Sequence, residues 1–359
     1  MTSREQLARW LAVVPAPTPV SLEHWLDAGR EEGIDTLLAA HWQTSNNLSA
    51  VDRAACNETI QRAHARELHF QAHERSALSA LQLAGIDVLV LKGAALARWL
   101  YPSPHLRTRS DLDLLLQSEA DFNRCRNALL VLGYEDRDAP LLPPCYERAL
   151  RKRVGMGEHC VDVHWRLSNH PAFAQCFTFM ELWAERQPLS GLPDSWGLSP
   201  VHAMIHACLH RACNLTEAAG DRLIWLYDIA LLAMRLSEVE WSSLLSLASR
   251  FHISEPCRHT LVAARCLFDS PIPEAVIQEL TVTASVEVFR MDRAHQLGYR
   301  SYWAFRMLPW SERVPWLWRK MFPDWRFMQA HFGLTHFGQL PSAYARRMLR
   351  LLVATMRRR

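Results

Sequence analysis

Two aspartates, Asp111 and Asp113, stand two positions apart in the segment DLDLLL. This apolar run predicts a β-strand, in which a period of two places both carboxylates on one face and the leucines on the other. Carboxylates held this close repel each other unless a cation lies between them. A hard divalent ion such as Mg²⁺ accepts such ligands and completes its coordination with water and phosphate oxygens. The pair indicates either a metal site for phosphoryl chemistry or two exposed acids at a solvated strand end.

A third aspartate, Asp162, occurs in another candidate strand, HCVDVHWRL at residues 159–167. Alternation puts Asp162 and His164 on one face, and a carboxylate between valines is costly to bury without a partner. If this strand lies beside the first, three carboxylates meet, and such a set can hold two ions. His164 could orient a substrate or Asp162, or it could be a hydrogen-bonded histidine of the framework.

A short turn, Lys92-Gly93-Ala94, follows the apolar run at residues 86–91 and leads into a helix-forming segment. The run is rich in β-branched residues, which is typical of a buried strand. A glycine at such a turn lets a phosphate approach the backbone, and free N–H groups at a helix start attract anions. Lys92 could add positive charge for a triphosphate, or it could simply be solvated.

Two arginines, Arg107 and Arg109, immediately precede the first aspartate pair. The planar guanidinium group suits phosphate oxygens, so both are candidates for nucleotide binding. The alternative is that one or both pair with the neighbouring aspartates Asp111 and Asp113.

The elements around these motifs predict an α+β fold. Helical spacing dominates before residue 80 and again after Pro200, whereas the predicted strands fall between them. A helix is expected at 119–132, followed by a loop with Pro140, Pro143 and Pro144. We therefore expect a small mixed β-sheet core flanked by helical regions, divided as 1–80, 81–190 and 191–359.

Three histidines recur every four residues in VHAMIHACLHRAC, at positions 202, 206 and 210. Imidazoles at this spacing share one helix face and could bind a metal. A hydrogen-bonded contact between these histidines and Asp228, on a neighbouring helix, is the favoured interpretation because it would satisfy a buried carboxylate. Asp228 could instead reach the active site from the helical side.

The C-terminal segment SAYARRMLRLLVATMRRR predicts a basic amphipathic helix. Such a helix could contact RNA or an acidic membrane surface, although a solvated helix end explains the pattern without any partner. Tryptophans and arginines also alternate between residues 303 and 326. Aromatic core packing is the expected role of these tryptophans, with stacking on bases or a sugar as the alternative.

The composition limits the classes of protein that fit. A net charge of +3 is too small to indicate a nucleic-acid binder by itself. The N-terminus lacks the pattern of a secretory signal, and the most apolar stretch is interrupted by Asp228, so we expect no membrane span. Nine cysteines without a C-x-x-C pair indicate buried thiols in the cytoplasm.

In combination, the K-G-A-A turn, R-S-D-L-D-L-L-L and V-D-V-H-W-R-L resemble the polymerase-β-like nucleotidyltransferase superfamily. The closer resemblance is to a bacterial family with an L-K-G turn, a D-x-D strand and a D-x-H-W strand. It extends to RLIWLYDIALL at 222–232 and covers roughly residues 80–240. The resemblance implies that Asp111 and Asp113 bind both metal ions, that Asp162 supplies the third carboxylate, and that the Gly93 turn holds a triphosphate.

One position departs from the superfamily pattern. The superfamily usually has Gly-Gly or Gly-Ser at the turn, where this chain has Gly93-Ala94. Backbone N–H groups and Lys92 would therefore have to bind the phosphates without help from a serine hydroxyl.

The implied activity is transfer of a nucleoside monophosphate from an NTP to a hydroxyl acceptor, which could be a small molecule, a nucleic acid or a protein. Mg²⁺ is the expected cofactor, with Mn²⁺ as the alternative. A first rival is an inactive nucleotidyltransferase fold that binds nucleotides or partners, as in a regulatory or toxin–antitoxin system. A second is a D-x-D glycosyltransferase, although only one convincing strand precedes Asp111.

Overall fold

The computed structural model describes residues 2–12, 21–45, 47–136, 145–155, 157–192, 194–216, 220–294, 296 and 298–356, with side chains as far as residue 350. Two features named above lie outside these residues. They are the prolines of the loop at 140–144 and the three terminal arginines at 357–359.

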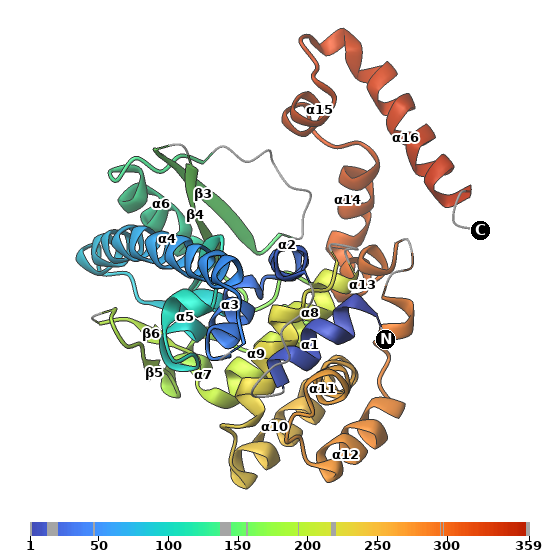
Figure 1. Cartoon of the computed structure of the whole chain (residues 1–359). Helices are drawn as coiled ribbons and strands as arrows, with labels where there is room; N and C mark the ends of the chain where they lie inside the picture. Colours follow the sequence, from blue (N-terminus) through green and yellow to red (C-terminus); the bar gives the residue numbers. More distant parts are fainter. Residues whose placement is uncertain are drawn as a thin grey trace.

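Helices precede the sheet in the chain, and the longest of them lies along it (Figure 1). This helix, α4, begins after Ser49, whose hydroxyl accepts a hydrogen bond from the Asp52 backbone N–H. Gly85 follows its end with a φ of 64°, a conformation that glycine adopts without strain. The helices of this part are α1 (Ser3–Ala12), α2 (Leu22–Glu32), α3 (Asp35–Gln43) and α4 (Ala50–Leu83).

The sheet described in the structure is mixed and has the strand order β3-β4-β2-β1-β6-β5. β2 is parallel to β4 and antiparallel to β1, and β1 is parallel to β6. Both outer pairs are antiparallel. The strands are β1 (Val88–Val90), β2 (Asp111–Leu116), β3 (Glu147–Val154), β4 (Gly157–His164), β5 (Gln187–Pro188) and β6 (Trp196–Gly197). The predicted α+β class with a small mixed sheet is confirmed.

The two faces of the sheet belong to different cores. Leu112 and Leu114 of β2 pack with Val161 of β4 in a core that includes α4 and α6 (Phe122–Leu130). Leu115, on the opposite face of β2, joins a larger core built with the C-terminal helices. Because side chains alternate along a strand, Asp113 must point toward the same side as Leu115. The carboxylates therefore face the helical region and not the first core.

β3, which pairs with β4 along its whole length, was not predicted from the sequence. Its sequence, ERALRKRV, is dominated by charged residues. Only Ala149 and Leu150 of β3 are buried, and as consecutive residues they point to opposite faces, so no alternating apolar pattern marks this segment as a strand. The helix expected at 119–132 is present but shorter, as a 3₁₀ turn (Glu119–Asp121) followed by α6.

Helices return after the sheet, beginning with α8, and the first of them pack with α1, α2 and α3 in the larger core. The last three, α14 to α16, extend away from the rest of the molecule (Figure 1). Nowhere in the described chain is a helix both long and apolar enough to cross a membrane. The helices from residue 178 onward are α7 (Phe179–Ala184), α8 (Pro200–Thr216), α9 (Leu223–Ala233), α10 (Glu238–Arg250), α11 (Ser254–Phe268), α12 (Glu274–Ser285), α13 (Tyr299–Met307), α14 (Trp310–Met321), α15 (Trp325–Phe332) and α16 (Leu340–Met356).

The predicted C-terminal helix is confirmed as α16, and both a solvated helix end and a contact with RNA or a membrane stay open as its role. The nearby tryptophans divide between two environments. Trp303 and Trp316 are buried, as expected of core packing, but Trp310 and Trp318 are exposed.

Candidate active site

A cavity of about 520 Å³ lies between the sheet and helices that come from both the N-terminal and the C-terminal parts of the chain. Its wall is formed by the end of β1, the start of α5 (Lys92–Trp99), the segment before β2, and residues of α2, α4, α8 and α9. The charged side chains that line it are Arg30, Asp35, Arg62, Arg66, Lys92, Arg107, Arg109, Asp111, Asp113, Arg222 and Asp228. Basic groups outnumber acidic ones in this set, which favours an anionic ligand.

The three predicted carboxylates lie on neighbouring parallel strands. Asp113 of β2 and Asp162 of β4 are register partners, and Asp111 stands two residues before Asp113 on the same face. Burial and the charge of Asp113 raise the pKa of Asp111 to about 6, and the same two causes raise the pKa of Asp162. Asp111 and Asp113 line the cavity, whereas Asp162 lies beside them, where its carboxylate accepts a hydrogen bond from the Cys160 thiol (3.2 Å).

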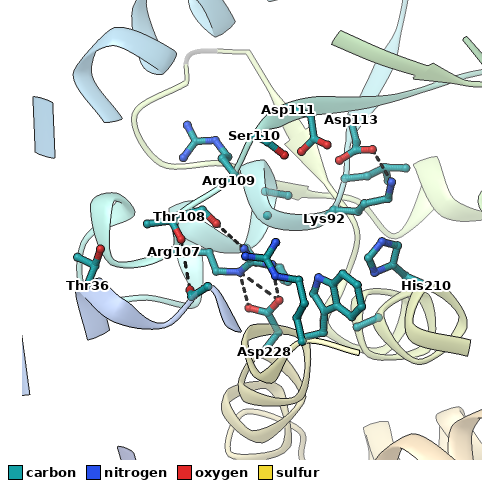
Figure 2. A pocket seen from close by; sticks show the side chains of 18 of the residues that line it. Thr36, Lys92, Arg107, Thr108, Arg109, Ser110, Asp111, Asp113, His210 and Asp228 are labelled. Atoms are coloured by element: carbon teal, nitrogen blue, oxygen red, sulfur yellow. Dashed lines mark hydrogen bonds and ion pairs between the residues drawn. The ribbon is translucent and has the colours of Figure 1, made fainter. Parts of the chain in front are cut away.

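Asp113 is almost fully buried and is held by two side chains. The Lys92 ammonium donates to its Oδ1 at 2.5 Å, as Figure 2 shows, and His164 Nε2 lies 3.0 Å from the same oxygen. Burial alone would raise the pKa of Asp113, but Lys92 and His164 outweigh it and hold that pKa below its ordinary range. Asp113 is thus fixed in its ionised form.

His164 orients Asp113 and not Asp162, which fits the framework role given as one alternative above. Its other nitrogen, Nδ1, lies 3.1 Å from Glu147 Oε2. Glu147 is the register partner of His164 on β3. It was missed because β3 itself was missed.

The glycine turn is closed by an arginine. Lys92 has a φ of 49°, which is strained for a residue with a β-carbon, and no side chain caps the start of α5. A β-carbon on Gly93 would lie 3.2 Å from Arg107 Nη1, so the glycine makes room for this guanidinium. Ala94 is buried in the core with α4 and α6 and does not line the cavity.

Arg107 forms a buried ion pair with Asp228 of α9 (Figure 2). Its Nε donates to Oδ1 at 2.8 Å and its Nη2 to Oδ2 at 2.7 Å, which is a bidentate arrangement. The Tyr101 hydroxyl also donates to Asp228 Oδ1 at 2.7 Å. Asp228 therefore reaches the cavity wall from the helical side, as one alternative expected.

Arg109 forms ion pairs with two glutamates of α4. It donates to Glu74 at 2.8 Å and pairs with Glu67, and Arg98 lies 2.9 Å from both of these carboxylates. The suggestion that Arg107 and Arg109 pair with the neighbouring aspartates Asp111 and Asp113 was wrong. Partners distant in sequence neutralise both arginines, and no local spacing could reveal them.

The predicted hydrogen bond between the histidine helix and Asp228 was also wrong, because Arg107 and Tyr101 occupy that carboxylate. His206 and His210 instead line the cavity, and burial lowers the pKa of both. His210 Nε2 lies 3.1 Å from Asn214 Nδ2 on the same helix.

The three aspartates offer the carboxylate oxygens that a hard divalent ion prefers as ligands. Asp111 and Asp162 offer carboxylate oxygens that repel Asp113, and a cation would relieve this repulsion. In the described residues, however, no three His, Cys, Asp or Glu side chains are gathered as a preformed metal site. The Lys92 ammonium supplies the positive charge beside Asp113 in this arrangement.

A family model described as an uncharacterised nucleotidyltransferase matches residues 18–269, which include the sheet, the turn, the carboxylates and Asp228. A search of curated proteins finds no match. The match covers well over half of the chain, and the chain therefore belongs to this nucleotidyltransferase family.

Proposed function

We propose that the protein transfers a nucleoside monophosphate from an NTP to a hydroxyl acceptor. The acceptor oxygen forms a bond to the α-phosphorus, the bond between this phosphorus and the bridging oxygen breaks, and pyrophosphate leaves. Asp162 takes the proton of the attacking hydroxyl. The observation that carries the proposal is the register of Asp113 with Asp162 on neighbouring strands, where Asp111 and Asp113 line a basic cavity.

Asp111, Asp113 and Asp162 are the residues that would hold Mg²⁺, or Mn²⁺ in its place. A divalent ion supplies charge stabilisation for the attacking and leaving oxygens of such a displacement. The raised pKa of Asp111 and of Asp162 supports this assignment, because burial and the nearby charge of Asp113 leave both carboxylates in need of a cation.

The other residues of the site act by positioning. His164, backed by Glu147, fixes the direction of the Asp113 carboxylate. The ion pair of Arg107 with Asp228 fixes the wall next to Gly93, where the uncapped start of α5 offers backbone N–H groups. Such groups favour an anion, and their rigidity supplies rate by holding the phosphates in place.

The test is transfer of label from α-³²P-labelled ATP, GTP, CTP and UTP to small molecules, RNA and cellular protein. We expect transfer that requires a divalent ion and falls at least 100-fold in Asp113→Asn. Asp87→Asn, an exposed aspartate just before β1, is the matched control and should keep full activity. Full transfer by Asp113→Asn would refute the assignment.

A binding module without catalysis is the second candidate, and two observations favour it. The Lys92 ammonium already neutralises Asp113, and Ala94 offers no hydroxyl to a phosphate. Calorimetry that detects NTP binding, together with no pyrophosphate release against any acceptor, would support this candidate. Catalytic pyrophosphate release would eliminate it.

A further inference from the structure

The phosphates of an NTP need cations that are not already neutralised. The predicted candidates do not meet this need, because Arg107 is paired with Asp228, Arg109 with glutamates of α4, and Lys92 with Asp113. Removing a guanidinium from a buried bidentate pair would leave a buried charge without a partner, which is strongly unfavourable. Other basic residues of the same cavity must therefore be considered.

Arg222, the residue before α9, is exposed and lines the cavity. Its guanidinium lies against Gly33, where a β-carbon would stand 2.6 Å from Nη2. Gly33 has a φ of 75°, so both its conformation and this contact require glycine. Among the described residues no acceptor forms a hydrogen bond or ion pair with the Arg222 side chain. Partial burial and the nearby Arg107 lower its pKa, against the opposite effect of Glu32, Asp35 and Asp111.

Arg66 lines the same cavity from α4, on the N-terminal side of the sheet in sequence. Its guanidinium lies 5.4 Å from the centre of the Phe70 ring, and within the described chain it has no hydrogen-bonded or ion-paired acid. Arg66 and Arg30 both lower the pKa of Asp35, on the cavity wall, against the larger effect of burial.

The remaining basic residues of the wall differ from these two. Arg30 pairs with Asp27 at 2.7 Å, and Arg62 pairs with Glu58 on its own helix. Arg30 also lies 3.8 Å from Asp35, so acids occupy donors of both arginines in this structure. Among the described arginines of the cavity, Arg66 and Arg222 are thus the ones that no acid pairs with.

We infer that Arg66 and Arg222 bind the phosphate chain of the donor nucleotide, so that the nucleotide connects α4 with the start of α9 across the cavity. This inference rests on the proposed function and assigns the phosphate contacts that it leaves open. Arg107 and Arg109 then shape the wall that the phosphates contact, and they keep their own ion pairs throughout.

The experiment measures binding of inorganic tripolyphosphate and of each NTP by calorimetry, in the full chain and in Arg66→Gln and Arg222→Gln. A charge-assisted hydrogen bond contributes about 1.5–3 kcal/mol, so each variant should weaken binding about 10- to 100-fold. Arg222→Lys should recover part of the affinity because it keeps the charge. Arg235→Gln, an exposed arginine just beyond the other end of α9, should bind like the unmodified protein.

In the transfer assay the same variants should raise KM for the NTP about 10-fold or more and change kcat less. Their melting temperatures should match that of the unmodified protein, which separates lost phosphate contacts from lost structure. Unchanged tripolyphosphate affinity in Arg66→Gln and Arg222→Gln, or no tripolyphosphate binding at all, would overturn the inference. Arginine-dependent binding without transfer to any acceptor would uphold the inference and refute the proposed function instead.

Discussion

The guanidinium of Arg107 lies against Gly93, at a distance where a β-carbon on the glycine would be 3.2 Å from Nη1. This contact is tighter than ordinary packing, and the arginine cannot easily move away because Asp228 holds it at 2.7 and 2.8 Å. The glycine of the turn thus has a structural requirement that does not depend on any phosphate.

Gly93→Ala should therefore destabilise the protein by about 1–2 kcal/mol, since small-to-large changes in a packed site usually cost this much. It should also lower transfer, because the wall of the cavity moves. Urea unfolding of Gly93→Ala, Arg107→Ala and the double variant measures the coupling of the two positions. The alanine should cost clearly less once Arg107 is shortened. Equal costs in both backgrounds would show that the contact is unimportant.

The buried pair of Arg107 with Asp228 makes a second prediction. Asp228→Asn keeps the shape of the side chain but removes its charge, which leaves a buried guanidinium without a counterion. We expect a loss of about 3–5 kcal/mol in the free energy of unfolding. Tyr101→Phe, which removes one hydrogen bond to the same carboxylate, should cost only about 1 kcal/mol. A smaller loss for Asp228→Asn than for Tyr101→Phe would contradict this ranking.

A third prediction concerns stability in acid. His159 is fully buried, its Nδ1 lies 2.9 Å from the Tyr134 hydroxyl, and its Nε2 has no partner in the described residues. Burial, helped by His73 and Arg109, lowers its pKa from 6.5 to about 3. In the unfolded chain His159 is protonated below about pH 6.5, whereas in the folded chain it stays neutral down to about pH 3. The free energy of unfolding should therefore decrease as the pH is lowered through this window, by roughly 1.4 kcal/mol per pH unit.

The measurement is urea unfolding at pH 7 and pH 5 for the unmodified protein and for His159→Gln. The glutamine should cost stability at pH 7 but should remove about 2 kcal/mol of the loss seen at pH 5, because it does not titrate. Identical pH dependence in the two proteins would show that His159 is protonated in the fold.

Features that depend on residues close in sequence could be predicted, whereas contacts between residues distant in sequence could not. The strands of Asp111 and Asp162 and the turn at Gly93 were predictable because alternation and glycine chemistry act over a few residues. The structure places these two strands side by side, which is the condition under which the sequence predicted that the three carboxylates meet. The fold class followed from the same patterns.

The partners of the charged residues could not be predicted in this way. Asp228 lies 121 positions from Arg107, and Glu74 lies 35 positions from Arg109. Nothing local distinguishes an arginine that will pair with a distant acid from one that will stay free. From the sequence, phosphate binding was predicted for the arginines closest to the aspartates, whereas the described arginines of the cavity that no acid pairs with are Arg66 and Arg222.

Carboxylates from β2 and β4 act together in the proposed reaction. A variant of Asp162 is the most direct test, because its pairing with Asp113 in the sheet is what places this residue in the site. Transfer of labelled nucleoside monophosphate should be measured for Asp162→Asn beside Asp111→Asn and the exposed control Asp87→Asn. We predict that Asp162→Asn and Asp111→Asn each lose at least 100-fold in kcat while unfolding as the unmodified protein does. Full activity of Asp162→Asn would contradict the claim.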